Sequence, residues 1–480
     1  MSILSRADAG LGLAAGAAAA IVTVAFSLGN LPWIPLLLFA ALLLVTGAYW
    51  TLRRPERWVL VFLGAAVLLP PLPLPWGDAG PHPAIAVAAL GFTAGLANLP
   101  RWRLEAGSLA APVAFLWFAL CASLPWAAFY SGYAIAAGSL ARLGLFSLGI
   151  YLFFYVAAGP GRELRTASLL RLLFFSAAAA SAFAAADFYF QFPVPSRFAP
   201  QFIWLSGGVY RRAQGLFYEA STLAVFCVFA LVMATAVAER GVERELGLRR
   251  WQLGAAGIPL ALALVLSFSR TAMASCLLAL GVIIWLERAR LRWFRNLLRA
   301  AGALAVGGLL ALLLLALLLP NFLEAYVLRF WYTGAWFTEA PDLIFSHRLE
   351  SWGRLWEYVE SHPGRLLFGV GYKTLPYAGL DGEPVIADNT YFSMLVETGL
   401  MGLAALVWLH LTVVRCTWRW ATSSGTALGR VVGLSICSFW CGLIFQMLSG
   451  DTLTYWRVLP WLFAMLAAGL REAEGAGSGA

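Results

Sequence analysis

Eight charged side chains lie at or near the ends of apolar segments, where a charge is costly. Placing a charged residue at the centre of a membrane helix costs about 2.5–3.5 kcal/mol on insertion scales, so each of these residues needs a reason. If the apolar segments alternate across a membrane, all eight lie on its outer side. They are Arg142, Arg211, Arg212, Glu219, Arg270, Arg348, Asp388 and Glu397. Guanidinium groups gathered on one face would bind an anion, most naturally a phosphate, whereas the alternative for a single arginine is an interfacial anchor.

Arg270 has the most specific setting of the eight. The apolar stretch from Trp251 to Leu286 would form a helix about 54 Å long, well over the thickness of a bilayer. We therefore expect a break at residues 267–271. The helix that restarts there would present free backbone N–H groups and a positive dipole end beside Arg270, which suits a phosphate. Arg211 and Arg212 form a second outward cation pair, close to a glycine that allows near approach of a ligand.

The longest polar segment, residues 321–388, combines further candidate groups. Residues 346–360 have apolar side chains at helical spacing (Leu349, Trp352, Trp356 and Val359), which predicts an amphipathic helix with Ser346 as its N-cap. The segment then passes through Phe368–Gly371, a weak signal alone because no GxGxxG follows a strand. It ends at Asp388, whose carboxylate could accept a proton from a hydroxyl group.

The composition decides which elements must position these groups. The 480 residues are 61% hydrophobic and 12% charged with a mean hydropathy of +0.79, which excludes a soluble, secreted or disordered protein. We expect an all-α polytopic membrane protein with 12–14 transmembrane helices. The candidate spans centre near residues 18, 41, 66, 91, 118, 147, 180, 228, 259, 279, 309, 402, 440 and 464. The third should end early because Pro70 and Pro71 interrupt it.

The orientation follows from the basic residues. A cytoplasmic N-terminus puts about two thirds of the 33 basic residues inside, as the positive-inside rule requires. The net charge of +9 therefore predicts no nucleic-acid partner. The six cysteines avoid the long polar segment, so we expect no disulfide framework, and no cysteine or histidine grouping predicts a metal site or cofactor.

Several motifs, in this order, resemble the O-antigen ligase/polymerase superfamily over about residues 211–403. They are Arg212-x-x-Gly215-x-Phe217, Ser269-Arg270, Arg348-x-x-x-Trp352, Phe368–Gly371, Asp388–Tyr391 and Glu397-x-Gly399. The resemblance implies a GT-C-like, inverting glycosyltransferase of the bacterial inner membrane. Its donor would be a glycan on undecaprenyl diphosphate and its acceptor a glycan or lipid-linked glycan. Arg212, Arg270 and Arg348 would bind the donor diphosphate, and Arg211 is a further candidate for that role.

Two departures from the family pattern bear on the assignment. Ligases typically have His-Asn where this chain has Asp388 and Asn389, which moves the prediction toward a Wzy-type polymerase and makes Asp388 the candidate base, with His347 as an alternative. Glu219-Ala220 replaces a Pro-Asn found in many relatives, so Glu219 is either a second carboxylate or the ion-pair partner of Arg212. Arg142 either contacts the diphosphate or pairs with Asp187 or Glu219. Asn389, Tyr391 and Glu397 are expected to support the site.

The sequence thus predicts five regions: helices 1–7 in residues 1–190, helices 8–11 in 191–320 with the short periplasmic loop of Arg211 and Arg212, a large helical periplasmic loop in 321–388, helices 12–14 in 389–471, and a disordered tail in 472–480. Both termini would be cytoplasmic and the active site periplasmic. The predicted function is metal-independent glycan transfer by an O-antigen or exopolysaccharide polymerase, for which membrane lipids and a chain-length regulator are further candidate partners. The alternatives are an O-antigen ligase that uses lipid A–core, and a polyprenyl-lipid or glycan transporter.

Overall fold

The computed structural model describes residues 46–47, 49, 53–72, 81–103, 107–194, 201–205, 208–288, 348–378 and 384–474. Within these residues the regular secondary structure is helical apart from one antiparallel hairpin, in which strand β1 (Phe202–Leu205) pairs with β2 (Gly208–Arg211). The helices are α3 (Arg57–Leu68), α4 (Pro83–Ala97), α5 (Ala110–Ala157), α6 (Thr166–Phe190), α7 (Ala220–Arg240), α8 (Arg250–Leu266), α9 (Arg270–Glu287), α13 (Arg348–Ser361), α14 (Leu375–Ala378), α15 (Thr390–Ser423), α16 (Ala427–Gln446) and α17 (Leu459–Glu474).

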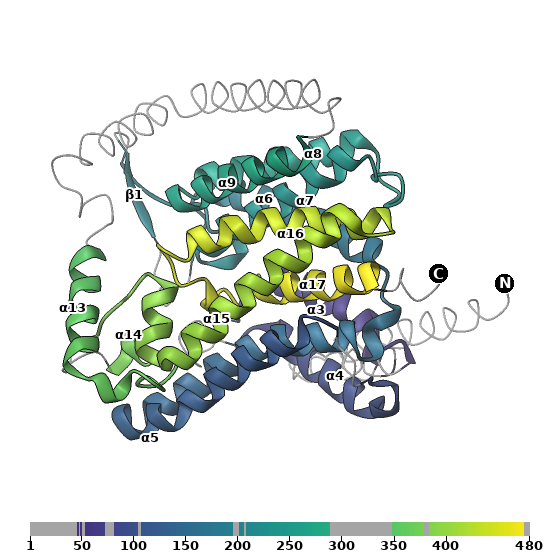
Figure 1. Ribbon diagram of the computed structural model, residues 1–480. Helices are drawn as coiled ribbons and strands as arrows, with labels where there is room; N and C mark the ends of the chain where they lie inside the picture. The colour runs from purple at the N-terminus through teal and green to yellow at the C-terminus, as the bar shows by residue number, and fades with distance from the viewer. Residues whose placement is uncertain are drawn as a thin grey trace, which may run out of the picture.

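The long helices run side by side, and α13 stands across one end of the bundle (Figure 1). Six of the helices are long and apolar enough to cross a membrane: α5, α6, α7, α9, α15 and α16. The protein is therefore an all-α polytopic membrane protein, as its composition predicts. The predicted spans near residues 18, 41 and 309 have centres outside the described residues. The other eleven positions each fall inside a helix, while the total of 12–14 spans stays a prediction.

Helix α5 is a helical hairpin and contains two of the predicted spans. Its 48 residues include Gly132, whose φ of +83° is left-handed and favours glycine. The indole Nε1 of Trp117 donates a hydrogen bond of 2.8 Å to Ser147 Oγ. Thirty residues of straight helix would separate these side chains by about 45 Å, so the chain must reverse at Gly132. The separate segments predicted near residues 118 and 147 are confirmed.

Two predicted interruptions also occur. Helix α3 ends at Leu68 and Leu69 is extended, as the following prolines require. Helix α8 ends at Leu266 and α9 begins at Arg270, with Phe268 between them at a φ of +52°. We call the end of the bundle at which α9 begins the Arg270 end.

Helix α13 buries a face that matches the predicted one at Val359, which packs against the buried cluster, and at Trp352, which is half-buried, but not at Leu349 and Trp356. Leu355 is its fully buried residue and joins a small apolar cluster with Val370, Leu375, Val385, Ala387 and Val396. Leu349 and Trp356, assigned to the apolar face from their spacing, are instead exposed, and Ser346 lies outside the described residues. The face is set by the loop and the start of α15 that pack beneath the helix, which helical spacing alone does not reveal.

Candidate active site

Arg212 lies against the break between α8 and α9. Its Nε donates a hydrogen bond of 2.6 Å to the carbonyl oxygen of Ser267, and the next residue, Ala213, donates its N–H to Leu266 O at 3.0 Å. A cation at a helix C-terminus is favoured by the dipole and by the carbonyls that lack helical partners. Arg270 is the first residue of α9, three residues further on. Arg212 and the start of α9 therefore flank a single break in the bundle.

The neighbouring Arg211 makes a buried ion pair instead. Its Nη2 lies 2.5 Å from Asp187 Oδ1, and both side chains are less than a tenth exposed. The Gln191 side chain accepts a hydrogen bond from the Arg211 N–H at 2.9 Å and holds the same strand. These contacts give Arg211 a structural role between β2 and α6, and Asp187, one of the two ion-pair partners considered for Arg142, pairs with Arg211 instead.

Arg348 and Asp388 meet at the Arg270 end of the bundle. Arg348 Nε lies 3.1 Å from Asp388 Oδ2, and both side chains are partly accessible, 24% and 44% exposed. Trp352 Nε1 donates to Ala387 O at 2.8 Å, so two residues of α13 hold the segment that leads into α15. A partly accessible carboxylate beside a guanidinium can contact a substrate and accept a proton.

Glu219 connects the two sets of residues. It is the residue before α7, and Thr222 Oγ1 donates a hydrogen bond of 2.5 Å to its Oε2. Burial raises the pKa of Glu219; the Thr222 hydrogen bond and the charge of Arg212 oppose this rise, while Asp388 adds to it. Glu219 therefore lies within electrostatic range of both Arg212 and Asp388.

Tyr455 connects the same groups from the segment before α17. Burial raises the pKa of its hydroxyl, the charges of Glu219 and Asp388 raise it further, and Arg348 opposes them. Arg212, Glu219, Arg348, Asp388 and Tyr455 therefore form one group, which we call the Arg212–Asp388 cluster. It draws on residues from four separate parts of the chain.

Arg457 lies beneath this cluster and was not singled out from the sequence. It is 5% exposed and donates to the carbonyl oxygens of Ala66 at 2.6 Å, Leu69 at 2.9 Å and Leu216 at 2.6 Å. It thereby caps the end of α3 and fixes the turn that leads to Glu219. Burial lowers its pKa to about 9. The available signal was an arginine between the last two spans, in a short segment that also holds Asp451.

Arg142 and Glu397 belong to a second group. Lys373, the only lysine of the chain, is buried; its Nζ lies 3.8 Å from Glu397 Oε2 and also contacts Asp451 Oδ2. The Arg142 guanidinium stacks 3.8 Å from the ring centre of Tyr377 and acts electrostatically on Glu397. Glu397 therefore meets Lys373 and the charge of Arg142, and its supporting role in the site stays a prediction.

The Phe368–Gly371 motif fits against a kink in α15. Val370 N donates to Val396 O at 3.0 Å and Gly371 N to Glu397 O at 2.8 Å, just before Gly399, where α15 departs from helical geometry at a φ of +70°. A Cβ on Gly371 would lie 2.4 Å from Ala127 Cα, and its φ is +114°. The glycines Gly369, Gly371 and Gly399 therefore permit close backbone packing between the loop and the kink of α15.

Asn389 and Tyr391 hold the start of α15, the helix that follows Asp388. The Asn389 side chain accepts hydrogen bonds from the N–H groups of Tyr391 and Phe392 and donates to Leu448 O at 3.1 Å, so it is the N-cap of α15. The Tyr391 hydroxyl donates to Ile444 O at 3.0 Å. His347, the alternative base, lies outside the described residues.

Backbone strain gathers around these groups. The non-glycine residues with positive φ among those described are Gln191, Tyr218, Phe268, Lys373 and Asp388. Each is itself in, or lies within two residues of, a group described above. Such conformations cost about 1–3 kcal/mol each and cluster at functional sites. Asp388, at a φ of +43°, is the strained residue that also bears a candidate catalytic group.

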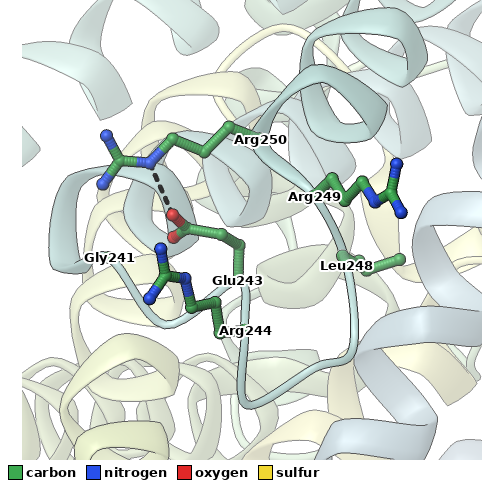
Figure 2. Close-up of a pocket in the computed structure, with 6 residues that line it drawn as sticks. All are labelled: Gly241, Glu243, Arg244, Leu248, Arg249 and Arg250. Carbon is green, nitrogen blue, oxygen red and sulfur yellow. Dashed lines mark hydrogen bonds and ion pairs between the residues drawn. The ribbon is translucent and has the colours of Figure 1, made fainter.

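A cavity of about 590 Å³ lies far from these groups, where α7 ends and α8 begins. Gly241, Glu243, Arg244, Leu248, Arg249 and Arg250 line it. Figure 2 shows Arg250 turned toward the Glu243 carboxylate, to which its Nε is bonded at 2.5 Å. The lining of this cavity contains none of the residues predicted to act on a substrate. Its arginines belong to the set that the positive-inside rule assigns to the cytoplasmic side.

No group of three or more His, Cys, Asp or Glu side chains that could hold a metal ion occurs in the part of the chain that the structure describes.

Comparison with known proteins agrees with the motifs. Residues 255–407 match the family model described as O-antigen ligase. The match covers about a third of the chain and supports the O-antigen ligase/polymerase superfamily expected from the sequence. The matched region contains Arg270, Arg348, Asp388 and Glu397, whereas Arg211, Arg212 and Glu219 precede it. No curated protein matches the chain. The family supports an enzyme of the glycan-transfer type.

Proposed function

We propose that the protein transfers an oligosaccharide from undecaprenyl diphosphate to a sugar hydroxyl on the periplasmic side of the inner membrane, without a metal ion, as a Wzy-type polymerase. The observation that carries the proposal is the Arg212–Asp388 cluster, which combines cations for a diphosphate with a carboxylate for a hydroxyl group. The periplasmic placement rests on the positive-inside rule. The assignment as a polymerase rests on Asp388, which stands where ligases have a histidine.

The chemistry follows from the charges. The acceptor oxygen attacks the anomeric carbon of the donor, its proton passes to the Asp388 carboxylate, and the bond from that carbon to the diphosphate breaks. Undecaprenyl diphosphate leaves with the bonding electrons. Arg212, Arg270 and Arg348 stabilise the negative charge that develops on it, as fixed guanidinium groups can do without a metal.

The decisive experiment uses purified protein with a synthetic undecaprenyl-diphosphate glycan and measures release of undecaprenyl diphosphate. We expect turnover that EDTA does not change and that Arg270→Ala abolishes. Arg249→Ala is the matched control, because Arg249 is an exposed arginine at the opposite end of α8. Activity that survives in Arg270→Ala, or is lost equally in the control, would contradict the proposed diphosphate site.

The role of Asp388 is tested with Asp388→Asn, which keeps the shape of the side chain and removes the proton acceptor. We expect a loss of about 10²–10⁴-fold in kcat, the usual contribution of general base catalysis, with donor affinity nearly unchanged. If the variant binds donor poorly and turns over normally once saturated, Asp388 binds the donor and is not the base.

The ligase assignment stays open, because the matched family is described by that activity. Product analysis separates the two. A polymerase converts the lipid-linked glycan alone into a ladder of longer lipid-linked chains. A ligase adds one donor chain to lipid A–core and leaves the donor unchanged when that acceptor is absent.

A further inference from the structure

The cavity between the end of α7 and the start of α8 is basic. Three arginines line it against a single acidic residue, Glu243. The arginines are exposed, whereas Glu243 is 5% exposed. The first turn of α8 adds the positive end of a 17-residue helix to the same place. A concave surface with this balance of charge attracts anions.

Glu243 sets the positions of two of the arginines. Figure 2 shows its carboxylate between the side chains of Arg244 and Arg250, while Arg249 turns away from it. The bond of 2.5 Å from Arg250 Nε to Glu243 Oε1 leaves both terminal amino groups of Arg250 as donors, and this side chain is 75% exposed. The Arg244 side chain makes no ion pair or hydrogen bond within the described part of the chain. Two such guanidinium groups suit the oxygens of one phosphate.

Below Arg250, one face of α8 is apolar and open. Gly254 and Gly257 follow Arg250 by four and seven residues, so they lie on its face of the helix. A Cβ added at either glycine would meet no atom within 4 Å. Trp251 and Ile258, 64% and 66% exposed, stand along one side of this face. Together they form a shallow apolar slot that begins at the arginines, which we call the Gly254 slot.

We propose that the cavity and the Gly254 slot bind one anionic phospholipid, with the head-group phosphate on Arg244 and Arg250 and an acyl chain along the slot. A soluble phosphate would use the arginines and leave the slot empty. A zwitterionic lipid would fill the slot but bring its own cation to a basic cavity. Basic pockets at the cytoplasmic end of membrane helices recognise anionic head groups, and the positive-inside rule assigns this end of the bundle to that side.

Native mass spectrometry of the full-length protein in detergent, titrated with phosphatidylglycerol, tests the head-group contact. We expect one saturable lipid, bound about 30-fold more weakly by Arg244→Ala/Arg250→Ala, since each arginine beside an anionic head group contributes about 5-fold. The matched control is Arg415→Ala/Arg419→Ala, which removes two exposed arginines near the end of α15 that the cavity does not include. An equal loss in both double variants would show general charge attraction and overturn the proposal.

A second variant tests the slot and leaves every charge in place. Gly254→Leu fills open space on a helix, so it should fold, and it should weaken phosphatidylglycerol binding about 10-fold or more, the effect of displacing two acyl CH₂ groups. Gly281→Leu is the control, because Gly281 is an exposed glycine of α9 that also has no atom within 4 Å. Unchanged affinity in Gly254→Leu would mean that the slot holds no acyl chain.

Two further probes identify the ligand. Phosphatidylcholine should bind less tightly than phosphatidylglycerol, and Arg244→Ala/Arg250→Ala should leave its binding unchanged. An excess of inorganic phosphate should not displace phosphatidylglycerol. Equal binding of the two lipids by the wild type would show that the cavity does not select an anionic head group, and displacement by phosphate would show a site for soluble anions; either result overturns the proposal.

Discussion

The adjacent residues Arg211 and Arg212 allow structural and catalytic contributions to be separated. Arg212→Lys keeps the positive charge but loses the Nε–H that binds Ser267 O at 2.6 Å and the planar fork that could hold two phosphate oxygens. Loss of one preorganised donor at a developing anion costs about 10²–10³-fold in rate, or about 2.7–4 kcal/mol. We expect a fall of that size in kcat/KM, with thermal stability within a few degrees of the wild type.

Arg211→Met should have the opposite effect. It leaves the Asp187 carboxylate buried without its partner, and removal of one member of a buried ion pair destabilises a protein by about 3–5 kcal/mol. The melting temperature should fall, while the protein that remains folded keeps its kcat. The double variant Arg211→Met/Asp187→Leu replaces both charges by apolar groups and should recover most of the lost stability.

The assay is release of undecaprenyl diphosphate from a synthetic donor, run beside thermal unfolding of the same detergent-purified samples. The reasoning is refuted if Arg211→Met loses kcat without losing stability, or if Arg212→Lys loses stability in proportion to its rate. Either result would mean that the buried pair and the diphosphate ligand have been assigned to the wrong arginines.

Two further predictions concern the supports of the site. Gly371→Ala should strongly reduce the yield of folded protein, because its Cβ would lie 2.4 Å from Ala127 and its φ of +114° disfavours alanine, whereas Gly364→Ala, with no atom within 4 Å, should express normally; equal yields would contradict this packing. Asn389→Ala should lower stability by about 1 kcal/mol or more through loss of the α15 N-cap, and Asn389→Asp, which retains the accepting oxygen, should recover part of it in thermal unfolding; identical melting temperatures for the two variants would exclude the capping role.

Much of the fold could be predicted because the signals are local. Apolar length set the positions of the helices, and the excess length of residues 251–286 required the break that the structure has at residues 267–269. The prolines after Leu68 likewise ended α3. The order of the motifs indicated the superfamily, and the family match over residues 255–407 agrees with it.

The burial of each charge was decided by the tertiary structure. Arg211 and Arg212 are adjacent and chemically identical, yet one pairs with Asp187 and the other reaches Ser267, because consecutive side chains of an extended segment point in opposite directions. Arg457 binds carbonyls of α3 that precede it by almost 400 residues. Sequence by itself determined that costly charges had to be satisfied at one end of the bundle. Only the packing of distant helices decided which charges satisfy one another and which are placed to meet a substrate.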